Sequence, residues 1–187
     1  MVILYVRTGE KYSNWWLDNL KFMLYNHCDN GDKLDIRGIE KGEGSVYDKL
    51  SLFEKFKDDE QYLYFDLDVV IKGDISHLIR DKFTLLNAWW RLPAHTPLNS
   101  SIMSWYGDHS YIHDKFYQDE DYYRVKYWRG IDEYIFKEID YNIYDKVCWS
   151  FMFDKKELEY PVCIFNQSYK ELHTCEWAKQ YILRNKI

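Results

Sequence analysis

The sequence predicts an α/β fold in which a mostly parallel central sheet is flanked by helices, with a small antiparallel portion in the second half. In the first half, short continuous apolar runs, typical of strands buried on both faces, alternate with segments of helical periodicity. In the second half, short strands and helices are mixed without this alternation. With 187 residues, the chain is expected to form one domain, 1–187, whose halves are 1–98 and 99–187.

The expected elements follow from apolar spacing and from residues that begin helices. Trp16, Leu20 and Met23 repeat with helical spacing after Ser13, whose hydroxyl can cap the helix. In chain order we expect a strand over 2–6, a helix from 13, a strand over 34–39, a helix over 45–57, a central strand from 61, a strand over 69–71, a helix over 74–79, strands over 83–89 and from 99, a helix over 130–139, strands over 147–153 and 162–165, and a terminal helix over 171–184. Residues 106–129 show no pattern that assigns an element.

Composition and charge exclude several classes of protein. The formal net charge of −6 argues against broad nucleic-acid binding, which needs a basic surface. No apolar run approaches the roughly 18 residues that a membrane span needs, and because residues 2–6 read as a strand, we expect no signal peptide there. The 4 cysteines form no C-x-x-C pair, so we expect reduced thiols and a cytoplasmic protein.

Two acidic residues close the central strand. Asp66 and Asp68 lie one residue apart at the end of an apolar run, and side chains at i and i+2 of a strand point to the same face. Both carboxylates can therefore converge on one ion. Hard oxygen ligands of this kind select Mg²⁺ or Mn²⁺, so the sequence predicts a site for one of these two cations. The alternative is a pair of solvated acids at a strand end.

Six segments of the chain form an ordered set of motifs: VRTGEKYSNWWLDNLKFML (6–24), GEGSVYDKLSLFEKF (42–56), LYFDLDVVIKGDISHLI (63–79), LNSSIMSW (98–105), RGIDEYIF (129–136) and CIFNQSYK (163–170). In this order they resemble the segments of GT-A glycosyltransferases, especially short forms related to glycosyltransferase family 8. The first resembles the opening that frames the nucleotide, the third the Asp-x-Asp strand, and the fourth the strand that faces the donor sugar. The resemblance implies a GT-A fold, with a nucleotide-binding half over 1–98 and an acceptor-side half over 99–187.

The resemblance also implies roles for individual residues. Asp68 would coordinate the metal, and Asp66 would bind the metal, the ribose or both. The remaining donor-binding residues that it implies are Arg7, Thr8, Gly9 and Tyr12 after the first strand, Lys49, Leu67 within the Asp-x-Asp segment, Asn99, Ser100 and Ser101, and Lys170 near the C-terminus. Each lysine could neutralise a phosphate, although a solvated helix face is the more common place for a lone lysine.

Asp132 and Asn166 leave two points open. Asp132 begins a helix at the family's acceptor-side turn and is the candidate base if the reaction inverts configuration. If the reaction retains configuration, Asp132 or the segment 99–101 would only position the donor sugar; an acid in a first helical turn is also favourable without any catalysis. Where the family carries a metal-binding histidine after phenylalanine, this chain has Asn166, so water and the diphosphate could complete the coordination. His173 lies nearby in sequence as a possible substitute.

The leading hypothesis is a metal-dependent hexosyl- or deoxyhexosyltransferase. It would move a sugar from a nucleotide-diphosphate donor, expected to be UDP-linked, to a hydroxyl of a glycan or glycoprotein. One alternative is a sugar nucleotidyltransferase, which ranks lower because the loop after the first strand holds a single glycine. The other is a non-catalytic carbohydrate-binding protein, with Trp89, Trp90 and Trp105 as sugar platforms or as core residues. The chain is either a minimal enzyme or one domain of a longer polypeptide.

Overall fold

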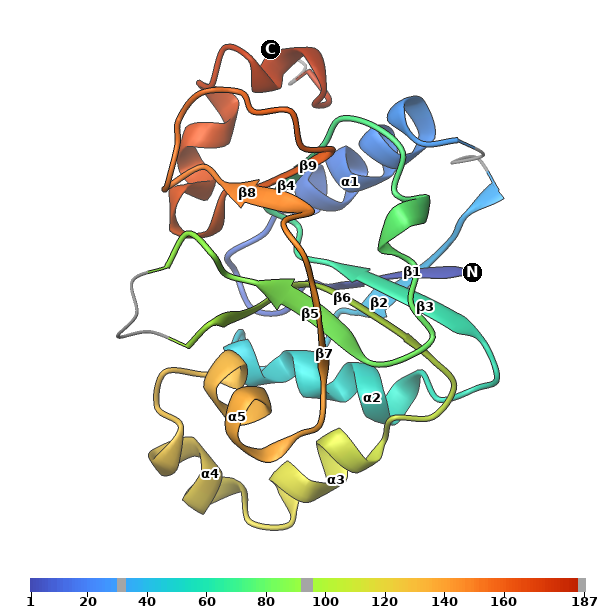
Figure 1. Ribbon diagram of the computed structural model, residues 1–187, viewed down its shortest axis with the longest axis vertical. Coiled ribbons are helices and arrows are strands. Elements are labelled where there is room, and N and C mark those ends of the chain that lie inside the picture. The colour runs from blue at the N-terminus through green and yellow to red at the C-terminus, as the bar shows by residue number, and fades with distance from the viewer. Residues whose placement is uncertain (30–32, 92–95, 185–187) are drawn as a thin grey trace.

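The computed structural model describes residues 1–29, 33–91 and 96–184, and its centre is a six-stranded sheet in the order β2-β1-β3-β6-β5-β7 (Figure 1). The strands of this sheet are β1 (Val2–Val6), β2 (Asp35–Ile39), β3 (Gln61–Phe65), β5 (Thr84–Asn87), β6 (Leu98–Tyr106) and β7 (Asn142–Tyr144). A second sheet has the order β4-β9-β8 and consists of β4 (Val69–Ile71), β8 (Cys148–Ser150) and β9 (Val162–Ile164). Strands from both halves of the chain therefore share each sheet.

Helices cover the two faces of the large sheet differently (Figure 1). On one face lie α1 (Asn14–His27), the small sheet and the two C-terminal 3₁₀ helices, η4 (Asn166–His173) and η5 (Ala178–Gln180). On the other face lie α2, α3, α4 and α5. The bounds of the remaining helices are η2 (Val46–Leu50), α2 (Ser51–Lys55), η3 (Ser76–Leu78), α3 (Tyr111–Tyr117), α4 (Glu120–Lys126) and α5 (Ile131–Glu138).

The two faces carry two separate cores because side chains alternate along each strand. In β1, Ile3 and Tyr5 join the core beneath α1, whereas Val2 and Leu4 join the core above α2 and α5. Every residue of β1 is buried, which explains why its sequence is continuously apolar rather than alternating. The prediction of a strand covered on both faces is confirmed here.

Strand direction brings several loops to one edge of the sheet. β1 pairs in parallel with both β2 and β3, so the segments that follow these three strands meet at that edge. β6 is antiparallel to both of its neighbours, and Phe65 of β3 pairs with Ile102 of β6. The amino-terminal part of β6 therefore lies beside the carboxyl end of β3, and the Asp66 N–H donates to the Ser101 carbonyl across 2.8 Å.

Several sequence predictions need correction. The predicted terminal helix over 171–184 is wrong, since this segment forms short 3₁₀ turns. Leu172, Ala178 and Ile182 are nevertheless buried, so packing against the core from separate turns overrides the helical pattern. The predicted helix over 74–79 shrinks to the 3₁₀ turn η3, because the Asp74 carboxylate accepts the Ser76 N–H at 3.2 Å and closes a local turn instead.

Smaller differences concern caps and missed elements. Ser13 occupies the N-cap of α1, but its hydroxyl caps no backbone N–H; the Trp16 N–H instead reaches the Ser13 carbonyl at 3.2 Å. Ser45 does cap the predicted helix over 45–57, which begins as η2 and continues as α2. The strand β7 and the helices α3 and α4 were not predicted: β7 exposes two of its three residues, α4 buries none, and α3 buries only Ile112 and Phe116.

Within the described residues, no helix is long and apolar enough to cross a membrane. All four cysteines are described, and each is a free thiol. Burial raises the pKa of the Cys28 thiol to about 12, which keeps this thiol protonated at neutral pH.

Candidate functional site

The acid pair lies just beyond β3, in the turn that leads into β4. The prediction that both acids belong to the strand is therefore wrong in detail: β3 ends at Phe65, and residues 66–68 form the connection to Val69. Leu67 is fully buried in the core beneath α1 and anchors this turn, so its side chain lies away from solvent rather than toward a donor. The two flanking carboxylates stay close enough for the charge of Asp66 to act on Asp68.

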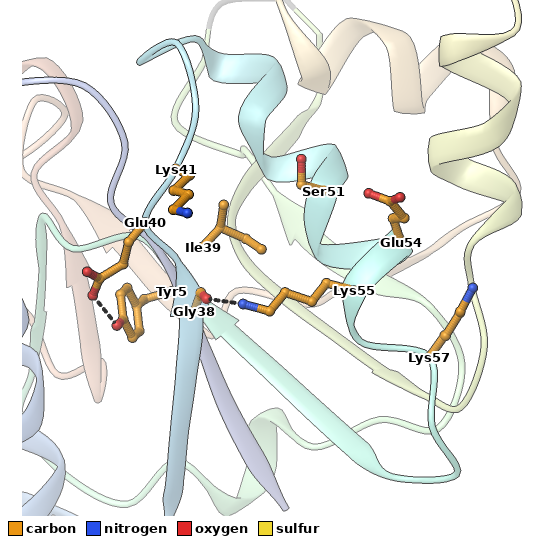
Figure 2. Close-up of a pocket in the computed structure, with 9 residues that line it drawn as sticks. All are labelled: Tyr5, Gly38, Ile39, Glu40, Lys41, Ser51, Glu54, Lys55 and Lys57. Carbon is orange, nitrogen blue, oxygen red and sulfur yellow. Dashed lines mark hydrogen bonds between the residues drawn. The ribbon is translucent and has the colours of Figure 1, made fainter.

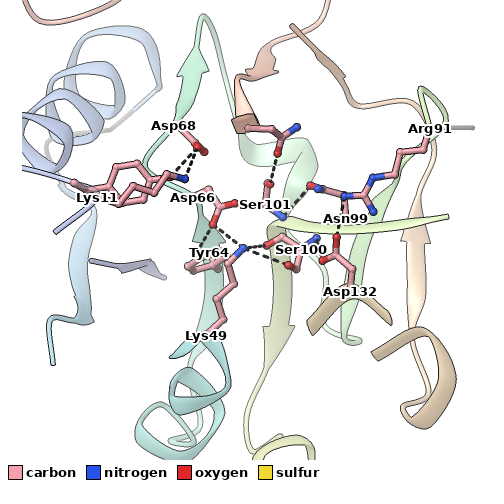
Figure 3. A network of polar contacts seen from close by, with 12 residues as sticks. Lys11, Lys49, Tyr64, Asp66, Asp68, Arg91, Asn99, Ser100, Ser101 and Asp132 are labelled. Atoms are coloured by element: carbon pink, nitrogen blue, oxygen red, sulfur yellow. Dashed lines mark hydrogen bonds and ion pairs between the residues drawn. The ribbon is translucent and has the colours of Figure 1, made fainter. Parts of the chain in front are cut away.

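Asp66 is held by a cation and a phenol (Figure 3). The Lys49 ammonium lies 2.7 Å from Asp66 Oδ1, and the Tyr64 hydroxyl donates to the same oxygen. Burial favours the protonated acid, but Lys49 and hydrogen bonds from Tyr64 and Ser101 outweigh it and lower the pKa of Asp66 below its ordinary value. Asp66 is therefore a carboxylate at neutral pH.

Asp68 is the more deeply buried acid, with 2% of its surface exposed. The Tyr12 hydroxyl donates to Asp68 Oδ2 at 2.7 Å, and the Lys11 ammonium lies 3.3 Å from that oxygen. Burial and the charge of Asp66 raise the pKa of Asp68 above its ordinary value. The other oxygen, Oδ1, is buried and has no hydrogen-bond partner among the described residues.

The start of β6 forms the floor of the site. Asn99, Ser100 and Ser101 are each at most 4% exposed. The Asn99 amide oxygen accepts the Ser101 N–H at 3.0 Å, which fixes the local backbone. The Lys49 ammonium donates to the carbonyl and hydroxyl oxygens of Ser100 at 3.3 and 3.2 Å, so one lysine connects the acid pair to this strand (Figure 3).

Asp132 lies in the first turn of α5 and faces β6. Its Oδ1 accepts the Ser100 N–H at 2.9 Å, and its Oδ2 pairs with the Arg91 guanidinium at 2.9 Å (Figure 3). The side chains of Asp132 and Arg91 are only 19% and 27% exposed. Each oxygen of the candidate base therefore already accepts one donor, an arrangement typical of a carboxylate that fixes the position of its neighbours.

Asn166 stands at the family's histidine position and lies beside the same strand. Its amide oxygen accepts the Ser101 hydroxyl at 3.4 Å, and its amide nitrogen donates to the Ser150 hydroxyl at 3.5 Å. The Asn166 backbone has φ +48°, in the left-handed region that asparagine tolerates better than most residues. The Phe165 N–H donates to the Asp68 carbonyl at 2.9 Å, which ties this turn to the acid pair.

His173 and Lys170 follow on η4. The His173 ring packs 4.3 Å from Trp15 and 5.5 Å from Trp16, on the aromatic side of α1. Lys170 is exposed, and its ammonium lies 5.9 Å from the ring of Tyr169. Tyr169 also packs against Tyr12 and the Lys11 ammonium, the two groups that contact Asp68. Lys170 therefore lies at the edge of the site, on the side of Asp68.

The loop after β1 packs against the loop after β2. Arg7 pairs with Glu40 at 2.8 Å, and the Thr8 side chain is buried. Gly9 has φ +62°, and a Cβ added there would lie 2.8 Å from the Cα of Gly44. The close approach of these two backbones requires glycine at this position.

The donor set fits a divalent cation. A buried carboxylate oxygen without a partner is costly, and a cation at Asp68 Oδ1 would satisfy it. Asp66 and the amide oxygen of Asn166 add further hard oxygen donors nearby, as Mg²⁺ and Mn²⁺ prefer. Within the described residues, no group of three or more His, Cys, Asp and Glu side chains gathers. Water or oxygen atoms of a bound ligand would therefore complete the coordination.

Two cavities differ in their relation to this site. One, of about 1040 Å³, is lined by Trp90, Arg91, Thr96, Trp128, Arg129, Asp132, Glu133, Ser150, Met152, Phe153, Asn166 and Gln167. It contains Asp132 and Asn166, and Ser101 hydrogen-bonds both Asn166 and Asp66, so one residue separates this cavity from the acid pair. The other, of about 760 Å³, lies between β2 and α2, where Lys41, Lys55 and Lys57 alternate with Glu40 and Glu54 (Figure 2).

Sequence reasoning missed three contacts of the site. Lys11 precedes the predicted Tyr12 and was passed over, although its ammonium is the cation nearest Asp68. Tyr64 looked like one more apolar strand residue, and Arg91 lies in a loop without a motif. Of the three proposed platforms, Trp105 is fully buried in the core, whereas Trp90 lines the larger cavity.

Solved structures share this fold at low sequence identity. A glycosyltransferase involved in glycosylation of the major capsid of PBCV-1 has a TM-score of 0.64 and 11% identity, over 96% of this chain and 100% of that chain. The galactosyltransferase LgtC, in complex with donor and acceptor sugar analogues, has a TM-score of 0.64 and 12% identity, over 97% and 94%. GlyE from Streptococcus pneumoniae TIGR4 has a TM-score of 0.56 and 11% identity, over 87% and 54%. No protein-family model and no curated protein matches the sequence. The predicted GT-A fold is confirmed.

Proposed function

We propose that this protein is a metal-dependent glycosyltransferase that moves a sugar from a UDP-linked donor to a hydroxyl of a glycan or glycoprotein. The observation that carries the proposal is the pair Asp66 and Asp68 beside the larger cavity, with the buried, partnerless Oδ1 of Asp68. The shared fold with glycosyltransferases, one of them solved with donor and acceptor sugar analogues, supports the same assignment.

Each residue of the site has a role in this proposal. A bound Mg²⁺ or Mn²⁺ would stabilise the charge that builds on the departing diphosphate. Asp68 and Asp66 would hold that cation, while Lys49 keeps Asp66 ionised and connects it to Ser100. Tyr12 fixes the orientation of the Asp68 carboxylate through its hydroxyl. Lys11 is the more exposed lysine, at 46% of its side chain, so its ammonium has room to turn from Asp68 to a donor phosphate.

The donor would lie across the edge where the three parallel strands end. Arg7, Thr8 and Gly9 follow β1 and would face the base and ribose, with Lys170 near the diphosphate from the side of η4. Asn99, Ser100 and Ser101 would face the donor sugar. The loops after β1 and β2 pack closely at Gly9 and Gly44, so this edge offers a fixed backbone at the strand ends, where α/β sheets bind ligands.

Asp132 is proposed to position the sugar rather than to serve as a free base. Arg91 holds Oδ2 and the Ser100 N–H holds Oδ1, so accepting a proton would require one of these contacts to open. This arrangement favours retention of configuration, in which no base of this kind is needed. If the product is inverted, Asp132 remains the base that this site offers.

A non-catalytic carbohydrate-binding protein is the second candidate function. One observation favours it: each carboxylate of the pair already has a lysine ammonium within 3.3 Å, and the family's histidine is Asn166. Such a protein would bind a sugar without needing a cation or a nucleotide.

Titration calorimetry with UDP, with and without Mn²⁺, separates the two functions. The transferase predicts UDP binding that Mn²⁺ strengthens, and Asp68→Asn is expected to weaken the Mn²⁺-dependent binding by about tenfold or more. Asp18→Asn is the matched control, because Asp18 is an exposed acid on α1. A UDP affinity that is the same with and without Mn²⁺, and the same in Asp68→Asn, contradicts the transferase, as does the absence of UDP binding.

A further inference from the structure

Trp128 is the most exposed aromatic residue in the described part of the chain. All eight tryptophans lie in the described part of the chain, and Trp128 alone among them is classed as exposed, at 74%. Leaving most of the largest apolar side chain in water forgoes the stabilisation that burial gives. The folded state therefore offers no packing reason for a tryptophan at this position.

A rigid turn presents this side chain. Tyr127 before it and Ile131 after it are at most 4% exposed and anchor the turn in the core beside α5. The Gly130 N–H donates to the Tyr127 carbonyl at 2.8 Å, and Gly130 has φ +106° with no room for a Cβ beside Val46. The Trp128 ring thus projects from a fixed backbone, with the Arg129 guanidinium 5.1 Å from its centroid.

The exposed ring lines the cavity that holds Asp132 and Asn166. Two more exposed apolar residues line that cavity from the turn after β8: Met152 at 53% and Phe153 at 57%. The turn at Trp128 and the turn after β8, which are distant in sequence, thus both place apolar side chains around this cavity, next to the proposed transfer site. A flat aromatic face with polar neighbours is the surface that a sugar ring fits, since its C–H groups stack on the ring and its hydroxyls reach the polar rim.

We propose that Trp128 is the platform on which the acceptor sugar stacks, an inference that rests on the proposed transferase function. The acceptor is then a pyranoside whose apolar face lies on the indole and whose hydroxyls meet Arg129 and Gln167 at the edge of the cavity. The acceptor approaches from the side of α4 and α5, opposite the nucleotide, which the loops after β1 and β2 receive.

Saturation-transfer NMR with methyl glycosides of galactose, glucose, mannose and fucose tests the platform without requiring turnover. The variants are Trp128→Ala, which removes the ring, and Trp128→Phe, which keeps a flat face. Tyr25→Ala is the matched control, because Tyr25 is an aromatic residue on α1, 48% exposed and outside the cavity. Thermal melts should show all three variants folded, since both side chains lie on the surface.

We expect at least one glycoside to bind the wild-type protein through its ring protons, and Trp128→Ala to weaken that binding about tenfold or more. Trp128→Phe should retain most of the affinity, and Tyr25→Ala should change nothing. Equal binding by Trp128→Ala and wild type overturns the proposal, as does the failure of every glycoside to bind the wild type at millimolar concentration.

The same samples separate this inference from the proposed function. If Mn²⁺-dependent UDP binding is present but Trp128→Ala binds the glycosides normally, the platform is wrong and the transferase stands. If the glycosides need Trp128 but UDP never binds, the sugar platform stands and the chain is a carbohydrate-binding protein.

Discussion

Replacing Lys49 with methionine tests the electrostatic centre of the site. The Lys49 ammonium lies 2.7 Å from Asp66 Oδ1, and the two side chains are only 15% and 18% exposed. Methionine keeps the length and the apolar stem of the side chain but removes the charge. The substitution therefore leaves a mostly buried carboxylate without its cation.

The cost follows from the geometry of this pair. At an effective dielectric constant of about 20, two unit charges 2.7 Å apart attract by about 6 kcal/mol. Part of this attraction only offsets the desolvation of both groups, so we expect the loss of one partner to cost about 3 kcal/mol of unfolding free energy. Without Lys49, burial would dominate and raise the pKa of Asp66, since Lys49 is the main group that lowers it.

Urea unfolding at neutral pH with EDTA measures this cost for Lys49→Met, Asp66→Asn and the double variant. The double variant should lose less stability than the sum of the single variants, because it leaves no unpaired charge. Lys82→Met, at an exposed lysine, is the control. A loss of less than about 0.5 kcal/mol for Lys49→Met would refute the reasoning, since such a value is typical of a solvated surface pair.

Three further predictions follow from other contacts. Gly9→Ala should lower the unfolding free energy by about 1–3 kcal/mol, because φ is +62° and the added Cβ would lie 2.8 Å from the Gly44 backbone. Gly73→Ala is the control: a Cβ there meets no atom within 4 Å and should cost far less, and equal losses for the two variants would contradict this reasoning. Hydrogen bonds from Tyr127 and Lys126 lower the pKa of Glu138 from 4.5 to about 2, so its contribution to stability is present above about pH 4.5 and is lost as the pH falls toward 2. Glu138→Gln should therefore flatten the pH dependence of the unfolding free energy between these values, and an unchanged pH dependence would contradict the contact. Asn166→His should tighten Mn²⁺ binding severalfold in calorimetry without nucleotide, because imidazole replaces a neutral amide oxygen; unchanged affinity would show that residue 166 does not face the ion.

The sequence predicted the parts of the fold that periodicity encodes. All of β1, and β3 from Tyr62 to Phe65, are apolar because both faces of the sheet are covered, and that pattern is visible without a structure. The acid pair was visible for the same reason, since two carboxylates interrupt an apolar run. The order of motifs then indicated that Lys49, the start of β6 and Asp132 belong together, and the structure brings them within hydrogen-bond distance.

The remaining features depend on contacts between distant segments. Nothing local indicates that Arg91 pairs with Asp132, 41 positions away, or that Lys11 reaches Asp68, 57 positions away. The C-terminal segment has the composition of a helix, yet Leu172 and Ala178 dock on the core as separate turns. Trp128 looked like one of many aromatic residues, and only its exposure and its place beside the cavity distinguish it.

Donor cleavage is the measurement that tests the proposed function most directly. Purified protein is incubated with UDP-glucose, UDP-galactose and UDP-N-acetylglucosamine in turn, with Mn²⁺ or EDTA, and released UDP is measured. The transferase predicts Mn²⁺-dependent UDP release from at least one donor, reduced about 100-fold by Asp68→Asn and unchanged by Asp18→Asn. Release that is equally fast in EDTA or in Asp68→Asn, or no release from a UDP-sugar that binds, would contradict a metal-dependent transferase centred on Asp66 and Asp68.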